Sequence, residues 1–279
     1  METVRNTGGR HQKNLRVVER KQENVEKMKT EKHDAIVLSS DSEKGAQGQF
    51  TDLLKNTPLP DDELLANLGI YMTSKNMSRM LFFYELYKRL VDTHGVIMEF
   101  GVRWGQTMSM LSALRGIFEP FNRHRRIIGF DTFDGFVGMD EKDGANCKCV
   151  DGSFGVADSY ETYLDKVLHL QEELNPINHL KKYELVKGDA RETIPAYFDE
   201  HPEALVSMAI FDFDIYSPTK AALEAVIPRL FKGSILVFDE LCDDIFPGET
   251  VALMETLGVN GLRIKRMPMT ARISYAVVE

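Results

Sequence analysis

Apolar and polar positions follow two periods in turn along most of the chain. From residue 95 onward, short apolar runs alternate with stretches whose apolar residues recur every three or four positions. The short runs predict buried strands and the longer period predicts amphipathic helices. Strands are expected over 96–100, 126–130, 183–187, 205–211, 235–238, 262–267 and 273–278, and helices over 106–118, 160–174, 194–200, 220–230 and 249–257.

The order of these elements predicts the fold class. Strands that are joined through a helix cross over in the right-handed sense and lie parallel in one sheet. The last two strands follow each other without a helix, so they can form an antiparallel edge. We therefore expect an α/β fold with a mostly parallel seven-stranded sheet, an antiparallel C-terminal edge and helices on both faces.

The first 94 residues follow a different pattern. Residues 1–48 carry scattered single apolar residues among many charged and amide side chains, which predicts a flexible tail. Residues 49–94 predict a helical lead-in, because Ser74 to Asp92 has apolar side chains at helical spacing. This helix either packs on the sheet or forms a lid over a substrate pocket. Residues 95–279 are expected to form the main domain.

Charge is divided unevenly between the tail and the rest of the chain. The formal net charge is -9, although residues 1–50 hold 10 Lys and Arg against 8 Asp and Glu. An acidic folded part argues against a nucleic-acid partner. No apolar run is long enough to span a bilayer, and the N-terminus lacks a signal-peptide core. We therefore expect a cytoplasmic protein with no membrane partner.

Two neighbouring strands each lead into a pair of acids. Asp212 and Asp214 follow one strand, and Asp239 and Glu240 follow the next. Because open α/β sheets bind ligands at the carboxyl ends of parallel strands, these carboxylates should converge there. Converging carboxylates repel unless a cation lies between them, and oxygen ligands favour Mg²⁺ or another hard divalent cation. The alternative is that the acids cap the next helix and face solvent.

The other strand ends suggest a second ligand. Gly101 and Gly105 lie between the first strand and its helix, where a sharp turn and free amide groups suit an anion. Asp131 ends the second strand and can hold ribose hydroxyls. Asp189 follows the third strand and is placed to meet an adenine amino group. Each feature alone also fits an ordinary turn or cap, but together they outline a site for a nucleoside with an anionic tail.

Four segments at these strand ends are distinctive. They are Glu-Phe-Gly-Val-Arg-Trp-Gly at 99–105, Gly-Phe-Asp-Thr-Phe-Asp-Gly-Phe at 129–136, Asp-Phe-Asp-Ile-Tyr-Ser-Pro-Thr at 212–219 and Asp-Glu at 239–240. Together they resemble class I S-adenosylmethionine-dependent methyltransferases, and more narrowly the macrocin O-methyltransferase (TylF-type) family of antibiotic-sugar enzymes. The resemblance covers Leu65 to Glu279 and implies a Rossmann-like class I methyltransferase fold, with S-adenosylmethionine as cofactor.

The resemblance also implies roles for single residues. Cofactor contacts would come from the first four strand ends, and metal ligands from the fourth and fifth. The implied cofactor-binding residues are Glu99, Gly101, Gly105, Gln106, Thr107, Asp131, Thr132, Gly188, Asp189, Ala190 and Asp212, and the implied ligands of Mg²⁺ or another divalent cation are Asp212, Asp239 and Glu240.

The implied activity is metal-assisted O-methylation of a small hydroxylated molecule, either a sugar or a glycosylated natural product. A divalent cation lowers the pKa of a bound hydroxyl, and Asp214 is the candidate catalytic base that takes its proton. Two departures bear on this interpretation. The family usually has Asp-Asp where this chain has Asp239 and Glu240. Some relatives use a histidine as base after the second strand, whereas residues 132–168 contain none.

Two other functions stay open. The chain could methylate an amine without a metal, or it could bind S-adenosylmethionine without turnover because Glu240 has lost the metal. A nicotinamide dehydrogenase is disfavoured, since the G-x-G-x-x-G pattern is missing. The expected partners are the hydroxylated acceptor and further copies of the chain, because the apolar lead-in helix could be buried in a homo-oligomer.

Overall fold

The computed structural model describes residues 39–144 and 150–279. The strands within these ranges form one seven-stranded sheet in the order β3-β2-β1-β4-β5-β7-β6. They are β1 (Val96–Phe100), β2 (Ile127–Asp131), β3 (Tyr183–Lys187), β4 (Val206–Phe211), β5 (Ile235–Phe238), β6 (Lys265–Arg266) and β7 (Ser274–Val277).

Pairing within the sheet confirms the predicted fold class. The five strands from β3 to β5 in this order are parallel to their neighbours, whereas β7 runs antiparallel to both β5 and β6. β4 and β5 are adjacent, with Phe211 paired to Phe238. The acids that follow these two strands therefore leave the sheet side by side at its carboxyl edge.

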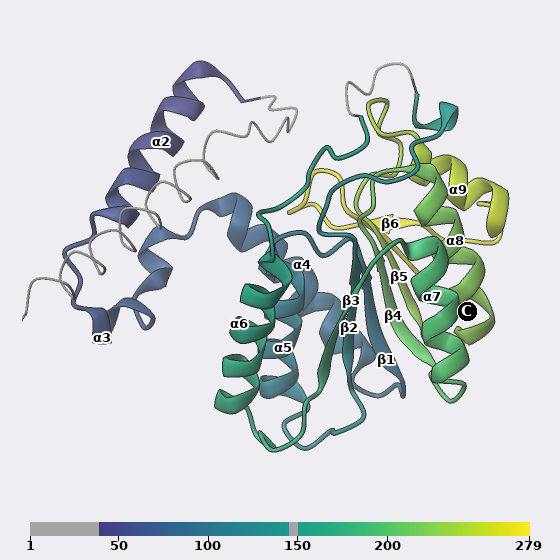
Figure 1. Ribbon diagram of the computed structural model, residues 1–279, viewed down its shortest axis with the longest axis horizontal. Coiled ribbons are helices and arrows are strands. Elements are labelled where there is room, and N and C mark those ends of the chain that lie inside the picture. Colours follow the sequence, from purple (N-terminus) through teal and green to yellow (C-terminus); the bar gives the residue numbers. More distant parts are fainter. Residues whose placement is uncertain (1–38, 145–149) are drawn as a thin grey trace, which may run out of the picture. The chain divides into compact units, whose positions relative to one another are not determined.

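Helices cover both faces of the sheet (Figure 1). One face carries α4 (Ser74–Leu90), α5 (Gln106–Phe118) and α6 (Tyr160–Leu174), and the other carries α7 (Ala190–Glu200), α8 (Tyr216–Val226) and α9 (Gly248–Thr256). The chain before α4 contains α2 (Asp41–Lys55), α3 (Asp61–Leu64) and the 3₁₀ turn η1 (Leu68–Tyr71). Two further 3₁₀ turns are η2 (Glu141–Asp143) and η3 (Ile227–Arg229).

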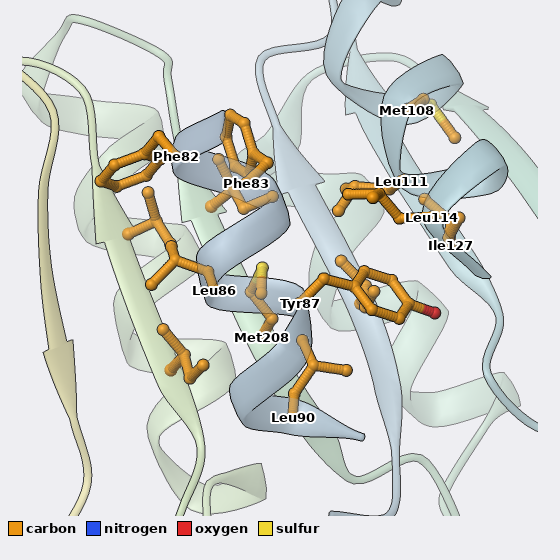
Figure 2. Packing of buried hydrophobic residues seen from close by; sticks show 14 of the residues in the cluster. Phe82, Phe83, Leu86, Tyr87, Leu90, Met108, Leu111, Leu114, Ile127 and Met208 are labelled. Atoms are coloured by element: carbon orange, nitrogen blue, oxygen red, sulfur yellow. The ribbon is translucent and has the colours of Figure 1, made fainter. Parts of the chain in front are cut away.

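The lead-in helix α4 packs on the sheet through one apolar stripe. Its buried residues recur at three- and four-residue spacing and meet side chains of α5 and of the central strands, as Figure 2 shows. The stripe comprises Phe82, Phe83, Leu86, Tyr87 and Leu90, and its neighbours include Met108, Leu111, Leu114, Ile127 and Met208. Burial on this scale, at about 2 kcal/mol for each large side chain, holds α4 against the sheet.

On the opposite face, four phenylalanines form a row across the last residues of β1, β4 and β5 and the next-to-last residue of β2. Phe100 stacks on Phe130 and on Phe211 with ring centroids 5.3 and 5.2 Å apart, and Phe211 stacks on Phe238 at 5.1 Å. Stacked aromatic pairs on neighbouring strands add to sheet stability. The row lies directly before Gly101, Asp131, Asp212 and Asp239, so it fixes the strand ends from which these residues project.

Three helix starts differ from the sequence prediction by four residues or more, and β6 (Lys265–Arg266) is shorter than the expected strand over 262–267. α7 begins at Ala190 rather than at Ile194, because Asp189 caps it. α8 begins at Tyr216 rather than Lys220, since Pro218 is accepted in a first turn that needs no amide donor. α2 begins at Asp41 behind a Ser40–Glu43 capping box, so it crosses the boundary expected at residue 48. Residues 1–38 of the predicted tail lie outside the described ranges.

None of the helices in the described part of the chain has the length and apolar character that crossing a membrane would require.

Candidate functional site

Asp212 and Asp239, the acids that directly follow β4 and β5, share one guanidinium group. Arg79 reaches them from α4: its Nη1 donates to Oδ1 of Asp239 at 2.8 Å and its Nη2 donates to Oδ2 of Asp212 at 3.0 Å. Nη2 also donates to the Thr107 hydroxyl at 3.0 Å. Burial works against the charge on Arg79, but the two carboxylates outweigh it and raise its pKa.

A second guanidinium group binds the outer side of the acids. Arg272, which precedes β7, donates to Oδ2 of Asp239 at 3.1 Å and pairs with Oε1 of Glu240 at 2.6 Å. Its Nη1 lies 3.8 Å from Asp243. Both carboxylate oxygens of Asp239 therefore face arginines, one from α4 and one from the edge of the sheet.

This arrangement gives the predicted metal site no support. The resemblance assigned Asp212, Asp239 and Glu240 to a divalent cation, and these side chains do converge, but each of them binds a guanidinium group. Among the described residues, no group of three or more His, Cys, Asp or Glu side chains is arranged to hold a metal ion. In this arrangement the acids have arginines as their counter-cations.

Asp214 stands in a strained turn beside this cluster. Its φ is 63°, and the amide of Ile215 donates to the carbonyl of Phe213 at 2.7 Å, which closes a three-residue turn around it. Strain of this kind often marks a functional position. Burial, followed by the charges of Asp212 and Asp239, raises the pKa of Asp214 well above its ordinary value. No hydrogen bond from the described residues reaches its carboxylate.

The glycine turn after β1 is shaped by close packing against the chain. Gly101 has a φ of 102°, and a Cβ at this position would overlap the carbonyl oxygen of Asp212. Gly105 has a φ of 75° and begins α5, and a Cβ there would overlap Leu164. The two glycines therefore let the β1 and β4 ends approach each other and leave the start of α5 accessible at Gln106.

Asp131 holds the same turn from β2. Its Oδ2 accepts hydrogen bonds from the amides of Val102 at 2.8 Å and Arg103 at 2.7 Å, and its Oδ1 accepts one from Phe133 at 2.6 Å. Burial raises its pKa, although these three bonds oppose the shift. The neighbouring Thr132 donates its hydroxyl proton to the carbonyl of Gly135 at 2.7 Å. Asp131, which the sequence predicts to bind the ribose, therefore also links the ends of β1 and β2.

Asp189 lies between Gly188 and Ala190 at the end of β3 and caps α7. It accepts from the backbone amide of Arg191 at 2.9 Å and also binds the guanidinium group of that residue. Hydrogen bonding to Arg191 lowers its pKa. Both its carboxylate oxygens therefore have partners within the chain.

Glu99 is buried at the end of β1 with one oxygen unsatisfied. Thr107 hydrogen-bonds its carboxylate, whereas Oε2 has no hydrogen-bond partner among the described residues. Burial, assisted by Asp212, raises its pKa well above the ordinary value, and Arg79 opposes the shift. An orphaned carboxylate oxygen beside the glycine turn can accept from a cationic or amide group of a ligand.

Sequence reasoning did not find Arg79, Arg272 or Glu249. Glu249 on α9 is fully buried, and its Oε1 accepts from the amide of Glu240 at 3.0 Å. A sequence signal did exist for two of the three. Arg79 continues the apolar stripe of α4 one turn before Phe83, and Glu249 continues the stripe of α9, so each is a charge at a position that the helix buries. Arg272 lies in a loop and has no such signal.

Comparisons with known proteins bear on this arrangement. The structure of CalS11, a calicheamicin methyltransferase, is similar to the chain at 40% sequence identity and a TM-score of 0.84, over 88% of this chain and 96% of CalS11. An apo structure of CalS11, described as a TDP-rhamnose 3'-O-methyltransferase of calicheamicin biosynthesis, gives 38% identity and a TM-score of 0.76 over 86% of this chain and 96% of the other.

The O-methyltransferase NovP is similar in fold, with 13% identity and a TM-score of 0.55 over 72% of this chain and 80% of NovP. No family model matches the chain, and no curated protein does.

Proposed function

Because the chain belongs to the class I S-adenosylmethionine-dependent methyltransferases, we propose that it methylates a hydroxyl group of a sugar that is carried by a nucleotide or by a small natural product. The observation that carries this proposal is the 40% identity, over 88% of the chain, to a methyltransferase described as acting on TDP-rhamnose. Placement of the chain in the narrower TylF-type family stays a prediction from the four motifs.

The first three strand ends fit the cofactor. S-adenosylmethionine supplies an electrophilic methyl group on a sulfonium and carries an amino group, a carboxylate and an adenosine. The unsatisfied Oε2 of Glu99 would accept from the amino group, and the amides at the start of α5 suit the carboxylate. Asp131 would accept a ribose hydroxyl at the one lone-pair site of about four that its three amide partners leave free.

Asp214 would act as the catalytic base. A hydroxyl becomes an effective nucleophile when its proton leaves as the oxygen attacks the methyl carbon and the carbon–sulfur bond breaks. Asp214 is half-buried, its carboxylate has no hydrogen-bond partner within the described chain, and its backbone is held in a tight turn. Its raised pKa makes it a better proton acceptor than an ordinary aspartate. Arg272 and, more weakly, Arg103 lie near enough to favour its ionised form.

Assistance by a divalent cation is a separate prediction from the resemblance. The buried Oε2 of Glu240 has no hydrogen-bond partner among the described residues, which leaves one oxygen to spare. Arg79 and Arg272 bind both oxygens of Asp239, Oδ2 of Asp212 and Oε1 of Glu240.

The test is methyl transfer to TDP-rhamnose, to other nucleotide sugars and to amino sugars, with S-adenosylhomocysteine as the measured product. We expect turnover with hydroxylated sugars, and we expect Asp214→Asn to lower kcat by about 100-fold or more. Asp199→Asn, which changes an exposed carboxylate on α7, is the matched control. Turnover confined to amines would favour the N-methyltransferase, and cofactor binding without turnover on any acceptor would favour the non-catalytic protein.

A further inference from the structure

The strongest unassigned feature of the molecule is the position of the Arg79 guanidinium group. It lies in the gap between the ends of β4 and β5, where the sequence predicted a metal ion, and it donates to Asp239 at 2.8 Å and Asp212 at 3.0 Å. Its side chain is 23% exposed, so most of the charge has been removed from water. A buried charge is retained only where fixed partners compensate it, and the two aspartates do so here.

A divalent cation and Arg79 cannot use the same oxygens. A bound Mg²⁺ would need carboxylate oxygens at about 2.0–2.1 Å. Oδ1 of Asp239 and Oδ2 of Asp212 already accept from Arg79, and Oδ2 of Asp239 accepts from Arg272. A second cation at this distance would be repelled by both arginines as well.

We propose that Arg79 is the resident cation of the acidic site and that it excludes divalent cations from Asp212 and Asp239. Metal binding through Oδ1 of Asp239 and Oδ2 of Asp212 requires the Arg79 side chain to withdraw from both carboxylates and from Thr107. The exclusion deepens the proposed function, because it sets the condition under which metal could assist methyl transfer. It does not itself depend on any turnover.

Arg79 also makes polar contacts between elements that pack mainly through apolar side chains. It begins the buried stripe of α4 and reaches Thr107 in the first turn of α5 as well as the two strand ends. Glu99 adds a further attractive charge to Arg79 from β1. Withdrawal of this side chain therefore breaks three polar contacts at once, so a weak ligand cannot displace it.

The experiment is Mn²⁺ binding to the full-length, cofactor-free protein, with the signal of free Mn²⁺ followed by electron paramagnetic resonance. Arg79→Gln removes the competing charge, and Arg89→Gln is the matched control. Arg89 lies on the same helix, and its guanidinium lies over the ring of Tyr275, 5.5 Å from the centroid. Removing an opposing charge at this distance should tighten Mn²⁺ binding by about tenfold or more, while R89Q should bind as the wild type does.

Two further variants locate the effect. Adding Asp239→Asn to R79Q should abolish the gain in Mn²⁺ affinity, because it removes one of the two carboxylates that the loss of Arg79 frees. Arg79→Lys, which can reach only one of the two aspartates, should give an intermediate gain and serves as the readout if R79Q melts below the assay temperature. Binding of Mn²⁺ that is equally tight in the wild type and in both Arg79 variants would overturn the proposal. The methyl-transfer assay is independent of this result, so either proposal can fail alone.

Discussion

At the scale of single residues, the site depends on carboxylates that have different partners. Asp131 binds three backbone amides, Asp189 binds an arginine, and Asp214 has no hydrogen-bond partner within the described chain. Residue type alone predicts four or five similar acids at strand ends. Their hydrogen-bond partners distinguish these acids: Asp131 and Asp189 hold loops in place, whereas Asp214 is available to accept a proton.

Asp131 supports both the glycine turn and the predicted ribose contact, so its substitution should affect stability and binding together. We expect Asp131→Ala to lower the free energy of unfolding by about 2 kcal/mol or more, since hydrogen bonds to a charged group contribute about 1.5–3 kcal/mol each. It should also abolish micromolar binding of S-adenosylhomocysteine in isothermal titration. Asp134→Ala, an exposed neighbour, is the control. A stable D131A that binds the cofactor normally would contradict both roles.

Glu249 should make stability depend on pH in one direction. Burial raises its pKa well above 4.5, so the folded chain holds the proton more tightly than the unfolded chain does. Stability is then full below the ordinary pKa and falls as pH rises toward the folded-state value.

Glutamine at position 249 can still accept from the amide of Glu240 but cannot ionise. Between about pH 5 and pH 8, urea unfolding of wild type should therefore lose more stability than that of Glu249→Gln, by up to about 1.4 kcal/mol per pH unit for one group. Parallel curves for the two proteins would show that Glu249 does not hold its proton.

At the scale of elements, the glycine turn shows where backbone rather than side chain decides the structure. Gly101→Ala should lower the free energy of unfolding by about 3 kcal/mol or more, because φ is 102° and the new Cβ would overlap the carbonyl oxygen of Asp212. Gly48→Ala in α2 is the matched control, since nothing lies within 4 Å of its Cβ position. Urea unfolding measures both, and G101A with wild-type stability would mean that the two strand ends can move apart.

The spacing of apolar residues along the chain predicts the helices and strands well, because helices cover both faces of the sheet. The bounds of β1, α5, α6, β3 and β5 agree with the sequence prediction, since buried strands read as short apolar runs and their helices as stripes. The site is less predictable. Asp212 and Asp239 converge because they follow two neighbouring parallel strands. The guanidinium group between them comes from a helix more than 130 residues earlier in the chain, and no local sequence pattern predicts a contact over that separation. The turn at Asp214 is equally hidden, because its strain depends on the surrounding packing.

At the scale of the whole molecule, several large apolar side chains on α4 and near the end of α5 are exposed. Leu81 and Tyr84 on α4 are partly exposed on the side away from the sheet, and Tyr84 packs against Phe118 at the end of α5 with ring centroids 5.5 Å apart. Ile117 and Phe121, which lie within three residues of Phe118 in the sequence, are 68% and 79% exposed. Contiguous exposed apolar side chains commonly mark an interface.

The expected interface is between copies of this chain, because α4 must stay in place for Arg79 to reach the acids and a second copy would cover its outer side. Light scattering after gel filtration should give a mass of at least twice 31.7 kDa. Leu81→Glu should shift the protein toward the monomer, because it introduces charge into the apolar surface, whereas Leu174→Glu on α6 should not. Both positions are exposed, so neither change disturbs the core. If the wild-type protein is a monomer, the exposed apolar side chains would instead contact the acceptor or another protein. A second copy of the chain would then not hold α4 in place.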